Sequence, residues 1–406
     1  MKSERSWGRL GMKSEWITHT FGDVCLRIYS GGTPSTKQAE YWNGEINWLS
    51  SGETGKRYIY DTDRKITELG VSKSSTQLAH KGDTVVASAG QGYTRGQASY
   101  LLIDTYVNQS VIVFHANAEL IDDKFLFFNL GSRYEELRQL SDGTSTRGGL
   151  SGWIVKRMEI DLPPLDEQKQ IVGILSAIDN KIELNTMINE NLEQQAQAIF
   201  RSWFVDFEPF GGVMPDDWRT GSLSEICKYS KDKVNIEDLT LDTYYSTENM
   251  QPNRQGAVKA TTLPSIKQTT ACKKGDVLIS NIRPYFKKII YCFADCGCST
   301  DVLCFVPNRS EYSAFLYCAL YSDKFFDYMV AGSKGTKMPR GDKQQIMMYP
   351  ICIPSDAYLE KFNKAVLPML ETVYTNRLEA DNLAMLRDTL LPKLMNGEID
   401  VSQVQI

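Results

Sequence analysis

The stretch Ile160-Asp161-Leu162-Pro163-Pro164-Leu165-Asp166-Glu167-Gln168 marks a change of structure along the chain. β-like residues end there at two prolines, which cannot donate to the hydrogen-bond ladder of a sheet. From Ile171 onward, apolar residues recur at alternating intervals of four and three, which places them along one face of a helix. The boundary therefore predicts a β-rich domain followed by a long helix. The expected seam of that helix is Ile171, Leu175, Ile178, Ile182, Asn185, Asn189, Leu192, Ala196, Ile199 and Trp203.

Two seam positions in the middle of this helix are polar, because they hold Asn185 and Asn189. Asparagine at such a position fixes the register of a helix pair at some cost in stability. A seam of this kind cannot be buried by the helix alone. The pattern therefore predicts a partner helix.

The same arrangement occurs a second time. The sequence Ile351-Cys352-Ile353-Pro354-Ser355-Asp356 resembles the first boundary, with Pro354 standing 190 residues after Pro164. A second seam follows it and again has an asparagine, Asn376, near its middle. Upstream, Lys81-Gly82-Asp83 matches Lys274-Gly275-Asp276 at an offset of 193, and both predict a turn that enters a buried strand. The chain thus contains two copies of one unit.

Two copies of a domain and a helix predict an α+β fold. We expect a first β-rich domain at residues 1–163, its helix at 164–209, a second domain at 210–353, and its helix and tail at 354–406. A helix of roughly 38 residues is about 57 Å long at 1.5 Å per residue. Packing the two helices as an antiparallel coiled coil with pseudo-twofold symmetry would bury both seams. The alternative is that each helix folds back on its own domain.

Composition limits the kinds of function. The chain has 406 residues and a net charge of −5, which argues against a uniformly basic nucleic-acid coat. Between Glu159 and Glu193, acids outnumber bases by eight to two, so this segment suits a protein partner better than phosphate. Nine cysteines without regular spacing predict reduced thiols. We expect a cytoplasmic protein without a membrane span or secretory signal.

No catalytic centre is expected. The phosphate-binding loop and the dinucleotide fingerprint are absent, and the three histidines are isolated in the sequence. Four clustered cysteines leave a zinc site, and with it a zinc-dependent nuclease, as an alternative. Their spacing lacks paired C-x-x-C units, so we predict buried strand cysteines and no metal. The four are Cys292, Cys296, Cys298 and Cys304.

Polar and basic loops recur at equivalent places in both units, and they are the candidate DNA-binding sites. Small residues let the backbone approach phosphate, while amide, hydroxyl, guanidinium and ammonium groups can donate to phosphate or base edges. In the first unit the candidates are Tyr93, Thr94, Arg95, Gln97, Thr144, Ser145, Thr146 and Arg147. In the second they are Asn281, Arg283, Tyr285, Lys287, Lys288, Ser333, Lys334, Thr336, Lys337 and Arg340.

Taken together, these features resemble the specificity subunit of type I restriction-modification systems. The resemblance covers nearly the whole chain. Its most specific parts are residues 160–178, the Ser30-Gly31-Gly32-Thr33-Pro34-Ser35 turn with Ile46-Asn47-Trp48-Leu49, the Tyr245-Ser246-Thr247-Glu248-Asn249-Met250 segment, and the ending Leu390-Leu391-Pro392-Lys393-Leu394-Met395-Asn396-Gly397-Glu398-Ile399. The second boundary departs from the pattern, because it lacks the double proline and the Glu-Gln pair.

The resemblance implies a non-catalytic subunit with two target-recognition domains, each reading one half of an interrupted sequence in double-stranded DNA. It implies two modification subunits that use S-adenosylmethionine to methylate adenine. It also implies restriction subunits that use ATP and magnesium, while this chain binds no cofactor itself. The competing interpretation is a coiled-coil assembly protein without sequence preference. Met1-Lys2-Ser3-Glu4 is echoed by Met12-Lys13-Ser14-Glu15, so both methionines are candidate translation starts.

Overall fold

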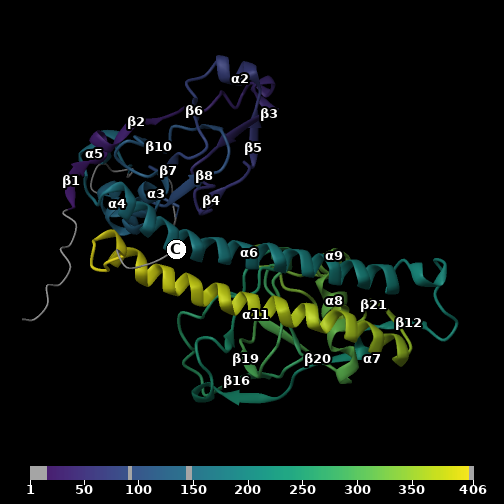
Figure 1. The fold of residues 1–406 in the computed structure, drawn as a ribbon. Helices are drawn as coiled ribbons and strands as arrows, with labels where there is room; N and C mark the ends of the chain where they lie inside the picture. Colours follow the sequence, from purple (N-terminus) through teal and green to yellow (C-terminus); the bar gives the residue numbers. More distant parts are fainter. Residues whose placement is uncertain (1–15, 90–93, 143–148, 402–406) are drawn as a thin grey trace, which may run out of the picture. The chain divides into compact units, whose positions relative to one another are not determined.

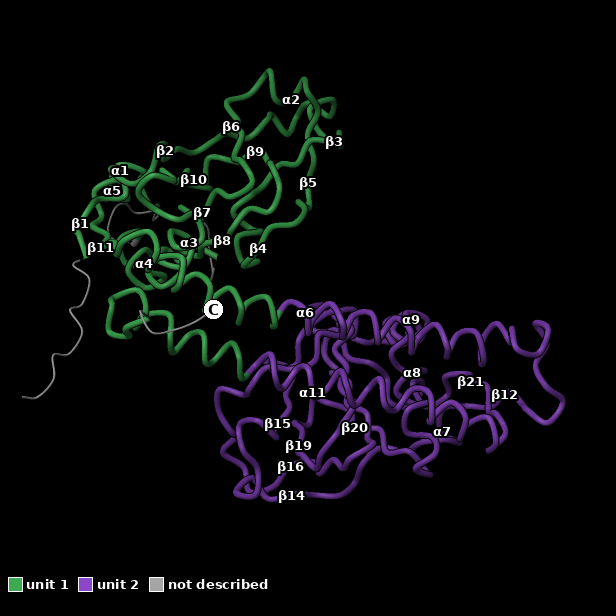
Figure 2. The backbone as a smooth tube through the Cα atoms, viewed as in Figure 1, with its two compact units in different colours: residues 1–182, 382–406 green, residues 183–381 purple. Residues whose placement is uncertain are grey.

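The structure, a computed structural model, describes residues 16–89, 94–142 and 149–401. The chain forms two compact units, residues 1–182 with 382–406 and residues 183–381 (Figure 2). Both long helices pass from one unit into the other. The sequence-based division into two domains and two helices stays a prediction, and each compact unit contains part of both helices.

The first unit contains two main sheets and a short two-stranded ribbon. The larger sheet has the order β2-β10-β7-β8-β4, the second has the order β5-β3-β9-β6, and β1 pairs with β11 (Figure 1). The strands are β1 (Ile17–Thr20), β2 (Cys25–Ser30), β3 (Trp42–Leu49), β4 (Tyr58–Ile59), β5 (Arg64–Ile66), β6 (Gln77–Ala79), β7 (Thr84–Ala87), β8 (Ala98–Leu101), β9 (Thr105–Val107), β10 (Val111–Ala116) and β11 (Glu159–Leu162). The shorter helices are α1 (Phe21–Val24), α2 (Glu68–Ser72), α3 (Asp123–Ser132), α4 (Tyr134–Asp142) and α5 (Gly152–Arg157).

The second unit repeats this plan with two four-stranded sheets. Their orders are β13-β20-β17-β18 and β14-β16-β19-β15, and β12 pairs with β21. The strands are β12 (Arg219–Ser222), β13 (Cys227–Tyr229), β14 (Lys233–Asn235), β15 (Tyr244–Tyr245), β16 (Gln268–Cys272), β17 (Val277–Ser280), β18 (Ile289–Tyr291), β19 (Cys296–Cys298), β20 (Val302–Pro307) and β21 (Pro350–Ile353). The shorter helices are α7 (Leu223–Ile226), α8 (Ser313–Tyr321), α9 (Asp323–Ala331) and α10 (Lys343–Met347).

The predicted repeat is confirmed at the level of strand order. The run β2-β10-β7-β8 corresponds to β13-β20-β17-β18, and β3-β9-β6 corresponds to β15-β19-β16. The copies differ at the edges of both sheets. In the smaller sheet, β5 is added beside β3 whereas β14 is added beside β16, and in the larger sheet β4 is added beside β8 in the first unit alone, among the described residues.

The Lys-Gly-Asp turns have the same geometry in both copies. The Asp83 carboxylate accepts a hydrogen bond from the backbone of His80 at 2.8 Å, and Asp276 does the same for Lys273 at 2.8 Å. Gly82 and Gly275 adopt φ of 95° and 94°, a conformation that favours glycine. The strands that follow, β7 and β17, are fully buried. The predicted turn into a buried strand is therefore confirmed in both units.

The two long helices are α6 (Leu165–Phe204) and α11 (Asp356–Met395), each of 40 residues. They run antiparallel within each unit. In the second unit, Phe200 lies against Phe362 and Arg377 binds Glu193, while in the first unit Arg387 binds Asp179. Each helix contacts both its partner helix and the domain cores, so the prediction of a helix pair is confirmed within each unit. The pseudo-twofold relation between the domains stays a prediction.

The seam differs from the expected one at the end of α6. The prediction placed Ile199 and Trp203 in the seam, but Phe200 and Phe204 are the buried residues there, 7% and 3% exposed. The reason is that the last turns of α6 pack on the aromatic core of the second domain as well as on α11. Ile199 and Trp203 lie at the margin of this core.

Among the described residues, none of the helices combines the length and the apolar character that crossing a membrane would require.

Candidate DNA interface

In the first unit, Thr94, Arg95 and Gln97 form a turn that leads into β8. The backbone of Gln97 donates to the carbonyl of Thr94 at 2.9 Å, and Gly96 donates to the carbonyl of Ala87 at the end of β7 at 2.9 Å. This ties the predicted turn to the end of a central strand. The remaining candidates of this unit lie outside the described residues: Tyr93, Thr144, Ser145, Thr146 and Arg147.

The described residues on either side of the second candidate loop, which contains Thr144 to Arg147, also contact the end of β7. The backbone of Leu150 donates to Ser88 at 2.7 Å, and Gly149 donates to Ser141 at 3.0 Å. Ser88 directly follows β7. The structure thus brings the flanks of both predicted loops together at the end of one buried strand.

In the second unit, the two candidate loops are joined directly. The backbone of Arg283 donates to Pro339 at 2.8 Å, Gly341 donates to Asn281 at 3.2 Å, and Ile282 and Arg340 form a β-bridge. Asn281 is 8% exposed and follows the buried strand β17. The predicted loops therefore form one surface at the position equivalent to that in the first unit.

The cationic side chains on this surface differ in whether a carboxylate already binds them. Arg340 binds Asp301 at 3.0 Å, and Lys334 binds Asp342 at 2.6 Å. Within the described part of the chain, the Arg283 guanidinium donates to the carbonyl of Lys337 at 3.5 Å and has no carboxylate partner. Among the described residues, the Lys337 ammonium has neither a carboxylate nor a hydrogen-bond partner, and its side chain is exposed, as are those of Lys334, Thr336 and Arg340. The Ser333 hydroxyl instead donates to the carbonyl of Val330 at 2.7 Å.

Two predicted lysines are held by other parts of the second unit. The Lys287 ammonium binds Asp323 at 2.6 Å, and the Lys288 ammonium donates to the carbonyl of Thr247 at 2.6 Å. Asp323 also binds Arg254, and hydrogen bonds from Arg254 and then Lys287 lower the pKa of its carboxyl to about 2. Both lysines therefore brace the loop in this structure.

A polar hollow that was not predicted from the sequence adjoins this surface. It has a volume of about 430 Å³ and is lined by the Ser246–Asn249 turn, Lys259, Thr261, Ser299 and Asp301, among others. Asn249 accepts from the backbone of Ser246 at 2.7 Å, as Glu53 does for Ser50 in the first unit at 3.2 Å. The signal in the sequence was the Tyr245 to Met250 segment, which supported the resemblance but was not assigned a role.

The asparagines of the seam meet across the helix pair. Asn185 is fully buried and donates to the carbonyl of Asn376 at 3.3 Å and to Glu379 at 2.8 Å. The Asn376 amide donates to Asn189 at 2.9 Å. Their role in fixing register stays a prediction.

Buried ion pairs between the helices were not anticipated from the sequence. Asp179, 2% exposed, binds Arg57 at 2.7 Å, Arg387 at 3.0 Å and the Tyr58 hydroxyl at 2.8 Å. In the second unit, Arg377 binds Glu193 at 2.7 Å. Burial raises the pKa of the Glu193 carboxyl, although Arg377 opposes the shift.

The four clustered cysteines lie in the core of the second unit, as predicted, with Cys296 and Cys298 on β19 and Cys304 on β20. All nine cysteines are free thiols. The described part of the chain contains no group of three or more His, Cys, Asp or Glu side chains placed to hold a metal ion.

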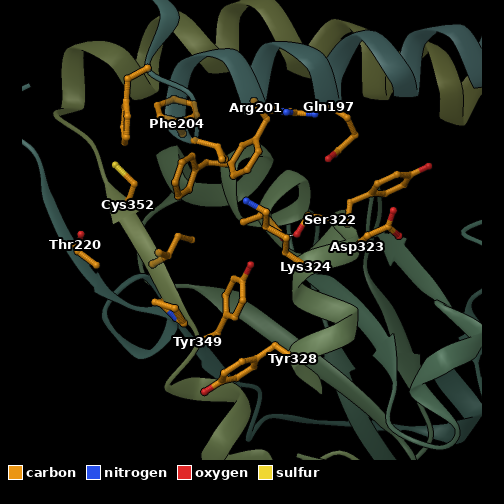
Figure 3. A pocket seen from close by; sticks show the side chains of 18 of the residues that line it. Gln197, Arg201, Phe204, Thr220, Ser322, Asp323, Lys324, Tyr328, Tyr349 and Cys352 are labelled. Atoms are coloured by element: carbon orange, nitrogen blue, oxygen red, sulfur yellow. The ribbon is translucent and has the colours of Figure 1, made fainter. Parts of the chain in front are cut away.

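A second hollow in the same unit, of about 970 Å³, lies where the end of α6 meets α8, α9 and β21 (Figure 3). Its walls include aromatic side chains such as those of Phe204 and Tyr349, and its cations are Arg201, Arg254 and Lys324. Asp323 also lines it. The ion pair that braces Lys287 is therefore shared between this hollow and the candidate DNA surface.

The fold and the paired loops define a class of protein: a duplicated β-rich domain on two antiparallel helices, with polar and basic loops at equivalent strand ends. The family model for the type I restriction modification DNA specificity domain matches residues 13–194. This match covers the first domain and most of α6, and the relatives described next are similar to the chain along nearly its whole length.

Two relatives align along almost the whole chain. The type I restriction enzyme MjaIX specificity subunit of Methanocaldococcus jannaschii is 28% identical over 424 residues, covering 96% of this chain and 95% of the relative. The HindI specificity subunit of Haemophilus influenzae is 23% identical over 479 residues, covering 95% of this chain and 100% of the relative. The fold is also similar to the crystal structure of the type I restriction-modification S subunit from M. genitalium. That similarity has a TM-score of 0.62 at 17% identity, covering 95% of this chain and 97% of the other.

Proposed function

We propose that this chain selects the DNA sequence on which a type I restriction-modification complex acts. Each β-rich domain reads one half of an interrupted target in double-stranded DNA, and the helix pair sets the distance between the halves. The chain carries out no chemistry itself. Its similarity to type I specificity subunits supports the first part of this proposal.

The proposal of a two-part target rests on the repeated position of the candidate loops. In each unit, the loop after the Lys-Gly-Asp strand and the loop before the long helix are tied to one strand end. The two loops of the second unit present Arg283, Lys337 and Arg340, which can contact phosphates or the major-groove edge of guanine. Two equivalent surfaces on one chain suit two half-sites.

The partners are two modification subunits, which would bind S-adenosylmethionine and methylate adenine, and restriction subunits that would use ATP and magnesium. Flipping the adenine and transferring the methyl group belong to the modification subunits. Of the eight acids between Glu159 and Glu193, Asp179 and Glu193 are held in ion pairs between the helices, and the exposed ones, such as Glu159, Asp166 and Glu190, suit a protein partner better than DNA. We expect the complex to act in the cytoplasm.

The test is to co-express this chain with the modification subunit encoded beside it in a host without DNA methylation, and to map modified adenines by single-molecule sequencing. We expect a two-part motif with a fixed gap that disappears when this chain is omitted. A soluble complex with a catalytically competent partner that methylates no defined motif would contradict the proposal.

A further inference from the structure

An exposed pair of aromatic rings projects from the candidate DNA surface of the second unit. Tyr285 and Phe286 are 49% and 38% exposed, and their ring centroids lie 4.7 Å apart. They form a short 3-10 turn with Pro284, which is buried beneath them. We call Tyr285 and Phe286 the aromatic knuckle. Packing within the chain leaves about half of the Tyr285 side chain and more than a third of the Phe286 side chain in contact with solvent, which marks the pair as a candidate contact surface.

The backbone on both sides of the knuckle is held in an unfavourable conformation. Arg283 and Lys287 have φ of 50° and 52°, in the left-handed region that residues other than glycine rarely adopt. Arg254, which lies against the turn, has φ of 65°. Such conformations persist where the surroundings impose them, and they concentrate at functional sites.

Backbone hydrogen bonds from the loop that contains Asn253 and Arg254 hold the aromatic knuckle in place. The backbone of Asn253 donates to the carbonyl of Phe286 at 2.8 Å, and that of Arg254 donates to Lys287 at 3.0 Å. The ion pair between Lys287 and Asp323 holds the end of the turn against α9. The rings are therefore presented on a rigid support, so that ordering them on binding costs little entropy.

The charges around the knuckle favour a polyanion as its partner. Arg283, Lys288 and Lys337 have no carboxylate partner among the described residues, whereas the nearby acids Asp301 and Asp323 are each already paired with cations. The surroundings thus carry positive charge that is not neutralised. Rigid aromatic rings surrounded by cations match the chemistry of nucleic acid, with its stacked bases and phosphates.

We infer that the aromatic knuckle is a wedge that enters the DNA between neighbouring base pairs of one half-site and unstacks them. This inference rests on the proposed function. Unstacking opens the duplex at one step, and the flanking cations bind the phosphates on either side. Such a wedge makes the complex prefer DNA sequences whose base-pair steps unstack easily. This preference does not require hydrogen bonds to the bases.

The experiment uses the full chain in complex with its modification subunit, and duplexes carrying the target motif found by methylation mapping. Single positions of the half-site are replaced in turn by 2-aminopurine, whose fluorescence rises when it is unstacked. We expect the wild-type complex to raise the fluorescence at one step. The Tyr285→Ala/Phe286→Ala variant should lose that rise and bind the target about 5- to 150-fold more weakly, the range expected for the loss of stacking on one base.

Three further variants separate the wedge from other effects. Tyr285→Phe keeps the ring and should keep the fluorescence rise. Ile266→Ala removes an equally exposed apolar side chain of the same unit and should change nothing. Urea unfolding curves, measured for every variant, test whether the double alanine variant is folded. A signal at the adenine that the modification subunit flips should persist in all of them, since it does not depend on the knuckle.

Two results would overturn the inference. One is a wild-type complex that methylates its motif but raises no fluorescence at any step besides the methylated adenine. The other is an unchanged rise in the double alanine variant. If the wild-type complex gives no motif at all, the proposed function itself fails, so the two failures are distinguishable.

Discussion

If the helix pair sets the gap between half-sites, lengthening both helices should lengthen the gap. The structure indicates where seven residues can be added to each helix. The compact units divide after Ile182 in α6 and after Asp381 in α11. Heptads inserted at these two points leave the Asp179–Arg387 contact inside the first unit and the Asn185–Asn376 contact inside the second. The new heptads would pair with each other and extend the seam.

The size of the effect follows from helix geometry. Seven residues at 1.5 Å per residue add about 10.5 Å. At 3.4 Å per base pair, this corresponds to an increase of up to about three base pairs in the gap. A heptad also rotates a straight helix by only about 20°, so the faces that read DNA keep nearly the same orientation on the helix pair.

The assay is methylation mapping with the variant chain and the same modification subunit. We expect the two half-sites to stay the same while the gap between them increases. Inserting the heptad into α6 alone is the control, and it should abolish methylation because the contacts of one unit are displaced by about 10.5 Å. A matched insertion that methylates with the original gap would refute the ruler function.

Three other predictions concern single side chains. Asp179→Ala should lower the free energy of unfolding by about 1–3 kcal/mol in urea titration, because it removes the buried carboxylate shared by Arg57, Arg387 and Tyr58, while Arg387 keeps Asp388. Arg95→Ala and Arg283→Ala should each relax the methylated motif in one half-site only, with a loss of discrimination of about 1–3 kcal/mol if the side chain reads guanine, whereas uniform weakening would assign it to phosphate. The carboxyl of Asp323 has its pKa lowered to about 2, against about 3.9 when unfolded, so its stabilising effect should be complete above about pH 4 and vanish as the pH falls through 2. The difference in urea midpoint between wild type and Asp323→Asn, measured against pH, checks this.

Much of the fold was predictable because its signals are local or repeated. The helix pattern begins at a proline boundary, and the Lys-Gly-Asp turns repeat with their glycine and aspartate in the same roles. What could not be predicted depends on contacts between distant segments. The fourth strand of the smaller sheet, β5 or β14, lies at opposite edges in the two units, and strand periodicity does not determine which edge a strand joins.

At the candidate site, too, contacts between distant segments could not be predicted from the sequence. Sequence reasoning found the loops around Arg283 and Arg340, because residue types and position after a buried strand were visible. It placed Lys287 and Lys288 among the DNA contacts without the information that each is held within the unit. It singled out Tyr285 but passed over Phe286, because a positive φ at flanking arginine and lysine leaves no mark in the sequence.

The buried charge in the helix pair explains how a duplicated chain avoids pairing each helix with its own copy. α6 and α11 are equivalent at an offset of 191 residues, from Leu165–Phe204 to Asp356–Met395. At that offset Asp179 corresponds to Leu370, and Arg387 corresponds to Ala196, both of which are buried and apolar. If two chains paired α6 with α6, Asp179 would face Ala196 and lose Arg387. If they paired α11 with α11, Arg387 would face Leu370 and lose Asp179. Both arrangements lose the Asp179–Arg387 ion pair, although Asp179 keeps Arg57 and Arg387 keeps Asp388, so pairing α6 with α11 is favoured by that one ion pair. Replacing the pair, in Asp179→Leu/Arg387→Leu, should therefore keep the chain folded but allow dimers by helix exchange, which sedimentation would detect. A strictly monomeric double variant would show that other contacts, such as those of Asn185 and Asn376, are sufficient to choose the partner.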